Sequence, residues 1–281
     1  MDRVIFKRTT TTQCLTFAIL AVLLPLSSTT FAETSDSTSS ATAYLSSYIV
    51  DLGGLITAPA HFSNEDWLKT ADIFAIGGVL FALDGNIRDA ITDSKTSTTT
   101  SIANVIHPIG EWQVAAPAIV ATYAFSYVIK DPHLGETALL SMESLVLSGI
   151  FVQALKTVTH RARPSQDPSA YDFSGPFSSS NHMSFPSGDV NGAFSVASVI
   201  AHEYPDQHLV AFISYGLAGL VGLERMELNK HYASDVFFGA ALGYFTGSYI
   251  VKQHGHPTEK GLTLSPIVVD HGVGISANYQ M

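Results

Sequence analysis

Six apolar segments of helical length dominate the chain from about residue 64 onward. They are rich in Leu, Ile, Val, Phe and Ala, carry interspersed Gly and Ser, and cover residues 73–83, 114–129, 138–155, 190–201, 209–223 and 236–251. Small residues on a helix allow neighbouring backbones to approach closely. The pattern predicts an all-α fold, a helical bundle of about six core helices.

The two ends of the chain have a different composition. Residues 33–60 are rich in Ser, Thr and Ala and predict a linker or loosely ordered arm. Residues 262–279 are rich in β-branched side chains around Asp270-His271-Gly272, which predicts a short β-hairpin within a C-terminal tail, residues 256–281. The helical domain is therefore expected between residues 61 and 255.

The first 32 residues have the pattern of a secretory signal. Three basic residues precede an apolar core at residues 14–26, and Thr30-Phe31-Ala32 forms a small-x-small cleavage site, so we expect cleavage after Ala32. The alternative is an uncleaved anchor. Either way the pattern predicts export to the cell envelope, with a periplasmic location.

Cys14 is the sole cysteine and lies within this signal. A mature chain without a thiol forms no disulfide. It also has no thiol nucleophile and no cysteine-based metal site.

The lengths of the apolar segments favour burial within an exported domain. A membrane-spanning helix needs about 20 apolar residues, whereas residues 73–83 number 11 and lie between Asp72 and Asp84. Three crossings after an exported N-terminus would also place residues 156–163 in the cytoplasm. Short and tilted spans exist, however, so an integral inner-membrane protein is the alternative.

Positive charge is scarce and concentrated. The formal net charge is −10 and the isoelectric point is near 5.4, which argues against a nucleic-acid partner. Five of the chain's 14 lysines and arginines nevertheless fall in residues 156–164 and 225–235. These two stretches are candidates for binding an anion.

The first stretch contains Lys156 and Arg163, seven residues apart, with His160 between them and Pro164 directly after. This spacing predicts that the two cations project from one helix face and that Pro164 ends the helix. Arginine and lysine both bind phosphate oxygens. The alternative is a basic helix end on the protein surface.

A second polar segment, Pro186-Ser187-Gly188, directly precedes the apolar segment that begins near Val190. A helix N-terminus presents free N–H groups and the positive end of the helix dipole to an anion. Ser187 adds a hydroxyl donor, and Gly188 lets the backbone approach a ligand closely. The alternative is an ordinary helix cap.

The third segment pairs an imidazole with a carboxylate. His231 and Asp235 are four residues apart at an expected helix start, and Arg225 adds a third cation. A carboxylate that binds one imidazole nitrogen leaves the other free as a nucleophile. A structural histidine–aspartate pair is the alternative.

Together the three segments resemble the type 2 phosphatidic acid phosphatase superfamily, which includes class A acid phosphatases and vanadium-dependent haloperoxidases. The family pattern is K-x₆-R-P, then P-S-G-H, then S-R-x₅-H-x₃-D. The chain carries K-x₆-R-P at 156–164, P-S-G at 186–188 and R-x₅-H-x₃-D at 225–235. The resemblance covers roughly residues 64–252.

The resemblance implies a role for each matching residue. The phosphate would be bound by Lys156, Arg163, Ser187, Gly188 and Arg225. His231 would attack phosphorus and form a phosphohistidine, Asp235 would orient it, and water would hydrolyse the intermediate. Neither metal nor cofactor is needed, because fixed cations stabilise the charge of the transition state.

Two positions depart from the family pattern. Glu224 replaces a serine and is expected to pair with Arg225. Asp189 replaces the second histidine, the general acid of the family. Three explanations remain open: Asp189 is protonated and acts as the acid at low pH, His182 or His160 substitutes for it, or the site binds phosphate and turns over slowly.

The sequence therefore predicts a cell-envelope phosphatase acting on phosphate monoesters, either lipid phosphates or small phosphate esters, with membrane association. A phosphate- or phospholipid-binding protein with a weak site is the main alternative. A vanadium-dependent haloperoxidase ranks lower, because its chemistry also uses the residue that Asp189 replaces. A purely structural membrane protein would require the cation cluster to be incidental.

Overall fold

The computed structural model describes residues 37–166, 169–178, 182–254, 261–269 and 272–280. The predicted signal peptide and its cleavage site lie outside these residues. The chain divides into two units, the first ending at Tyr44 and the second beginning at Leu45, and every contact discussed below lies within the second.

Eight α-helices are present among the described residues. They are α2 (Ser37–Thr57), α3 (Asn64–Ser94), α4 (Ser97–Gly110), α5 (Trp112–Ile129), α6 (Pro132–Thr159), α7 (Gly188–Glu203), α8 (His208–Glu227) and α9 (Ala233–His254), with short 3₁₀ turns at Ala58–His61 and Pro164–Gln166. The helical bundle is thus confirmed. The six predicted segments correspond to α3 and α5 to α9, and α2 and α4 are additional.

The expectation of a loose linker at residues 33–60 is wrong from Ser37 onward, since α2 occupies most of that stretch. Contacts far along the chain stabilise this helix despite its Ser and Thr content. Asp51 of α2 pairs with His254 at a separation of 2.5 Å, and Ser47 donates a hydrogen bond to Glu143. Tertiary contacts override a weak local preference in this way.

Local signals set the starts of two helices. Before α3, Ser63 and Asp66 form a reciprocal capping box with hydrogen bonds of 3.0 and 3.2 Å. Before α6, the Asp131 carboxylate accepts from the Leu134 backbone N–H, and Pro132 occupies the first turn, where no N–H is needed.

The end of α6 differs from the sequence-based expectation. The helix ends at Thr159, because His160 adopts a left-handed conformation with φ of 42°. The following residues form an extended stretch in which Arg161 bridges to Phe173. The prediction that Lys156 and Arg163 share one helix face is therefore wrong, and Pro164 is not what ends the helix.

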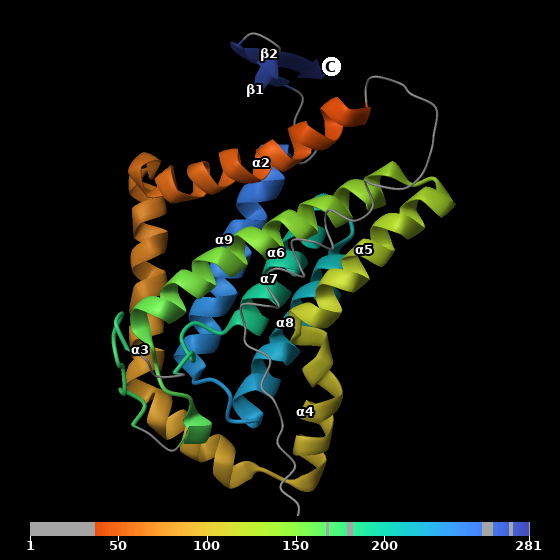
Figure 1. Ribbon diagram of the computed structural model, residues 1–281. Coiled ribbons are helices and arrows are strands. Elements are labelled where there is room, and N and C mark those ends of the chain that lie inside the picture. Colours follow the sequence, from red (N-terminus) through yellow and green to blue (C-terminus); the bar gives the residue numbers. More distant parts are fainter. Residues whose placement is uncertain (1–36, 167–168, 179–181, 255–260, 270–271, 281) are drawn as a thin grey trace, which may run out of the picture. The chain divides into compact units, whose positions relative to one another are not determined.

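Helix α7 lies among α6, α8 and α9 and packs against all three (Figure 1). Gly239, Gly243 and Gly247 are spaced four residues apart on α9, so they lie on one face of the helix, against the backbone of α7. A side chain at any of the three would collide with carbonyl oxygens of α7. This close contact places the starts of both helices side by side, which brings two of the predicted segments together.

In the part of the chain that the structure describes, four helices are long and apolar enough to cross a membrane: α3, α5, α6 and α8. Helix α3 has 31 residues rather than the 11 expected, and only 11% of its most apolar stretch is buried in the protein. Helix α5 is equally unburied. The preference for short, buried helices is therefore wrong, and the apolar outer faces support a membrane-embedded protein.

The strands β1 (Gly261–Val269) and β2 (Gly272–Gln280) pair antiparallel, with Gly261 opposite Gln280 and Val269 opposite Gly272. Asp270 and His271, which would form the turn between these strands, lie outside the described residues. Because the turn is not described, the C-terminal hairpin stays a prediction.

Candidate active site

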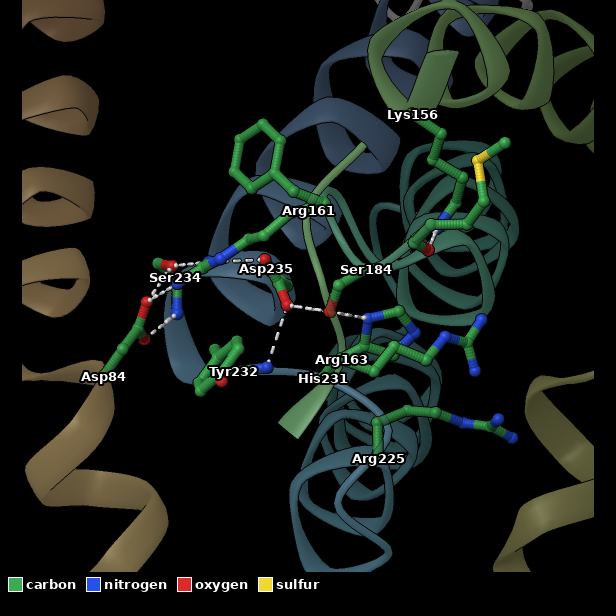
Figure 2. Close-up of polar contacts among 12 residues, drawn as sticks. Asp84, Lys156, Arg161, Arg163, Ser184, Arg225, His231, Tyr232, Ser234 and Asp235 are labelled. Carbon is green, nitrogen blue, oxygen red and sulfur yellow. Dashed lines mark hydrogen bonds and ion pairs between the residues drawn. The ribbon is translucent and has the colours of Figure 1, made fainter. Parts of the chain in front are cut away.

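The three predicted segments meet where the end of α6 and the end of α8 approach the starts of α7 and α9 (Figure 2). A methyl group at Gly188 would lie 3.8 Å from Cε of Lys156. The Ser187 N–H donates to the Asp235 carbonyl oxygen at 3.0 Å, and Arg225 pairs with Asp189 at 2.9 Å. Segments separated by tens of residues thus form one site.

His231 is buried directly before α9, beside the Asp235 carboxylate in the first turn of that helix. The distance from His231 Nδ1 to Asp235 Oδ2 is 3.7 Å, and the Ser184 hydroxyl lies 3.5 Å from the same nitrogen. Ser184 donates to Asp235 Oδ2 at 2.6 Å. This arrangement engages Nδ1 and leaves Nε2 as the nitrogen that can attack a substrate.

The charge state of this pair suits a nucleophile. Burial lowers the pKa of His231 to about 4, so its imidazole is neutral at neutral pH. Burial alone would raise the pKa of Asp235, but His231 and the Arg161 guanidinium outweigh it and hold that pKa below its usual value. A neutral imidazole therefore faces an ionised carboxylate.

Arg161, which the sequence-based assignment did not include, fixes the position of Asp235. Its guanidinium is completely buried and forms ion pairs with Asp235 at 2.6 Å and with Asp84 of α3 at 2.7 Å. Asp84 also accepts from the Ser234 backbone N–H at 2.9 Å. Figure 2 shows these groups in a line from Asp84 to Asp235.

Three aromatic rings surround the same guanidinium. Its carbon lies 4.4 Å from the Tyr232 ring centre, 5.1 Å from that of Phe81 and 5.3 Å from that of Phe173. Cation–π contacts of this kind strengthen when they are shielded from water. The position of Asp235, and through it that of His231, is thus held by residues from α3 and the loop after α6.

Cationic side chains lie on the side of His231 that points away from Asp84. Figure 2 shows the guanidinium groups of Arg163 and Arg225 pointing to the same side of the imidazole, away from Asp84. Burial lowers the pKa of Arg163, the charge of Arg225 lowers it further, and that of Asp189 opposes them. Lys156 donates to the Met183 carbonyl close by. Partly desolvated cations around one point make a strong anion-binding surface.

Ser187 occupies the N-cap position of α7, but its hydroxyl does not cap the helix. The oxygen is buried and has no hydrogen-bond partner among the described residues. A buried polar atom without a partner favours a role in binding a ligand over an ordinary cap. The adjacent N-terminal N–H groups of α7 add the positive end of a helix dipole.

Arg225 lies between two carboxylates. Its Nη1 is 2.9 Å from Asp189, and its Nε is 2.8 Å from Glu224, which confirms the expected Glu224 pair. The side chain of Asp189 is 28% exposed and lies in the first turn of α7. In this arrangement Asp189 is an ion-paired acceptor.

A further imidazole, absent from the sequence-based assignment, reaches the same arginine. His107 of α4 places Nδ1 at 2.6 Å from Arg225 Nη2, and its carbonyl oxygen accepts from the same nitrogen at 3.3 Å. The two residues are 118 positions apart, and nothing local to His107 indicates the contact.

His160 and His182 are the two histidines that the sequence suggested as substitutes for the family's second histidine. Each makes a different contact in the structure. His160 is the C-terminal cap of α6, where its backbone N–H bonds to the Lys156 carbonyl oxygen at 2.9 Å. Nδ1 of His182 lies 3.2 Å from the Ser174 hydroxyl.

One group of side chains elsewhere has the composition of a metal site. The ligand atoms of Asp51, Glu143 and His254 lie within 4.8 Å of one another. His254 ends α9 whereas the candidate active site lies at its start, about 30 Å away by helical rise. This group is therefore separate from the candidate active site.

The fold and site together define a helical protein in which a histidine, an aspartate and three cationic side chains lie close together at the ends of four helices. Residues 137–258 match the model of the PAP2 superfamily. This match confirms the resemblance that the three segments predicted.

Two lipid A 1-phosphatases are also similar to this chain in sequence. The chain is 29% identical over 168 residues to a lipid A 1-phosphatase of Porphyromonas gingivalis, covering 59% of this chain and 34% of that protein. It is 35% identical over 103 residues to a lipid A 1-phosphatase of Rhizobium johnstonii, covering 36% and 41% respectively. The chain thus spans between about a third and two fifths of the length of these relatives.

A solved structure shares the fold. It is a transmembrane PAP2-type phosphatidylglycerolphosphate phosphatase from Bacillus subtilis, with 21% identity and a TM-score of 0.51, and the match covers 65% of this chain and 94% of that one. The likeness supports the helical arrangement described above.

Proposed function

We propose that the protein is a membrane-associated phosphatase of the cell envelope that hydrolyses phosphate monoesters through a phosphohistidine intermediate. The observation that carries this proposal is the neutral, buried imidazole of His231, held beside Asp235 and facing two arginines. Phosphatase activity among the named relatives supports the same reaction class.

Binding of the phosphate group is the first step. Lys156, Arg163 and Arg225 contact its non-bridging oxygens, and the Ser187 hydroxyl and the Gly188 N–H donate further hydrogen bonds. The buried, unpartnered Ser187 hydroxyl supports this assignment. Five donors from four elements fix the phosphorus atom in front of His231.

Nucleophilic attack follows. Nε2 of His231 forms a bond to phosphorus while the ester oxygen leaves, and Asp235 stabilises the positive charge that develops on the imidazole. Water then attacks the phosphohistidine and releases phosphate. The fixed cations stabilise the additional charge of both transition states, so the proposed scheme needs no metal.

A lipid phosphate fits the location of the site. The apolar outer faces of α3 and α5 are suited to contact with acyl chains, and the site lies at the ends of the helices, where a headgroup phosphate meets water. The lipid phosphatases among the relatives support this substrate class. Small phosphate esters remain substrates of the same chemistry.

The test measures phosphate release by the full chain in detergent micelles from phosphatidic acid and from 4-nitrophenyl phosphate. We expect turnover that disappears in His231→Ala. In the control His202→Gln activity should persist, because His202 bonds within α7 to the Ser198 carbonyl oxygen. Brief reaction with ³²P-labelled substrate should label the wild-type chain in an acid-labile form. Unchanged activity in His231→Ala would refute the proposal.

A phosphate-binding protein with slow turnover is the second candidate, and the Asp189 carboxylate beside Arg225 favours it. A carboxylate at this point repels a phosphate dianion and lowers its affinity. Binding of inorganic phosphate without hydrolysis of either ester at pH 4 to 8 would identify this alternative.

A further inference from the structure

We propose that His107 of α4 is the proton donor to the leaving oxygen, a role that Asp189 does not fill in its ion-paired state. This inference rests on the proposed phosphatase function and adds a catalytic residue to it. It follows from the place of His107 beside the phosphate-binding guanidinium.

The reaction requires such a donor. Cleavage of the P–O bond leaves the electron pair on the ester oxygen, and a lipid or alkyl alcoholate is a poor leaving group unless a proton arrives with it. General acid catalysis of this kind contributes about 10²–10⁴-fold. Asp189 pairs with Arg225 at 2.9 Å as a carboxylate and has no proton to give in that state.

Geometry places His107 within reach of the bound ester. Arg225 contacts Asp189 through Nη1 and His107 through Nη2, so both side chains surround the same phosphate-binding group. Further along α4, a methyl group at Gly110 would lie 3.4 Å from Cβ of Asp189. The end of α4 thus lies directly against the start of α7, and a phosphate held by Arg225 has the imidazole beside it.

The surroundings of the ring suit proton transfer. Arg225 Nη2 donates to Nδ1 at 2.6 Å, so the neutral ring carries its proton on Nε2, 3.3 Å from Glu111 Oε1. In the protonated ring, Glu224 Oε1, 3.0 Å from Nδ1, is the acceptor for the second proton. Among the residues that the structure describes, Glu111, Glu224 and Arg225 are the charged groups in contact with the imidazole. Its side chain is 32% exposed, which lets it exchange protons with water between turnovers.

The two half-reactions balance. In the first, the His231 Nε2–P bond forms, the P–O bond to the alcohol breaks, and the His107 proton moves to the departing oxygen. In the second, water attacks phosphorus, His107 takes the water's proton, and the N–P bond returns its electron pair to His231. The sum converts ester and water to alcohol and phosphate, and both histidines regain their initial states.

The test compares kcat/KM of the wild type and His107→Gln for a series of phosphate esters from 2,4-dinitrophenyl phosphate to phosphatidic acid. We expect a loss of about 10²–10⁴-fold for the lipid ester and of less than about 10-fold for the dinitrophenyl ester, whose leaving group needs no proton. Retained activity on the latter also shows that the variant folds. The matched control His133→Gln, which breaks a similar pair with Glu203 at 3.0 Å, should show no such dependence.

Two further measurements sharpen the result. Introducing Asp189→His into the His107→Gln variant should restore hydrolysis of the lipid ester, because it supplies an imidazole at the same guanidinium. In the wild type, rates should vary little with the acidity of the leaving alcohol. A steep dependence in the wild type would overturn the proposal without any variant.

Other outcomes also overturn it. An equal loss in His107→Gln for every ester would mean that His107 only positions Arg225. A dependence on the leaving group that arises in Asp189→Asn instead of His107→Gln would make Asp189 the acid. If the wild type is active and only these comparisons fail, the proposed function stands; if no ester is hydrolysed, both fail together.

Discussion

Replacing Arg161 by methionine tests whether the site depends on its buried ion pairs. Arg161 is fully buried and is shared between Asp84 and Asp235 at 2.7 and 2.6 Å. Methionine has a similar volume but no charge. The substitution therefore leaves two buried carboxylates without their cation.

The expected loss of stability is large. Removing one partner of a buried ion pair costs about 3–5 kcal/mol, because the remaining charge is uncompensated. In a unit of this size each kcal/mol shifts the melting temperature by about 2–4 °C, so Arg161→Met should melt about 6–20 °C lower than the wild type. Adding Asp84→Asn to Arg161→Met removes one of the stranded charges and should cost less than the sum of the two single changes.

The assay is thermal unfolding of the full chain in detergent micelles, followed by tryptophan fluorescence. Lys69→Met is the control, because it breaks an ion pair with Glu65 of nearly the same length, 2.7 Å, on an exposed helix face. We expect no change in its melting temperature. A melting temperature for Arg161→Met within about 2 °C of the wild type would refute the reasoning.

Three further predictions concern acid stability, the support of Asp235 and helix packing. Burial lowers the pKa of His231 from 6.5 to about 4, so the unfolded chain binds this proton more readily than the folded chain. The free energy of unfolding, measured by urea titration, should therefore fall by roughly 3 kcal/mol between pH 6.5 and 4. In His231→Gln this contribution to the fall should be absent. Ser184→Ala removes the hydroxyl that donates to Asp235 and should lower the free energy of unfolding by about 1.5–3 kcal/mol in the same titration. An unchanged free energy of unfolding would contradict the role of this hydrogen bond in supporting Asp235. Gly243→Ala places a methyl group against the backbone of α7 and should destabilise the fold by about 1–3 kcal/mol, whereas Gly219→Ala, with open space around it, should not.

Much of the fold could be predicted from local patterns. The apolar segments matched α3 and α5 to α9, and the Ser63 cap marked the start of α3, because both signals depend on neighbouring residues. Helix α2 and the early end of α6 could not be predicted in this way. The first is stabilised by contacts with α6 and α9, and the second depends on a left-handed backbone at His160.

The membrane question shows the limit of counting apolar residues. Charged residues at the borders of residues 73–83 made this stretch seem too short to span a bilayer. Helix α3 extends well beyond both borders, and at the second border Asp84 is buried against Arg161 rather than exposed to solvent. A charge paired inside the bundle does not end an apolar helix.

By itself, the sequence determined the family resemblance and the residues of the three segments, because the family pattern consists of residue types at fixed spacings. Only the tertiary structure decided which side chains support them. Asp84 joins Arg161 over 77 positions and His107 joins Arg225 over 118. Such contacts arise from helix packing, and a buried charge takes whichever partner the packing brings within reach.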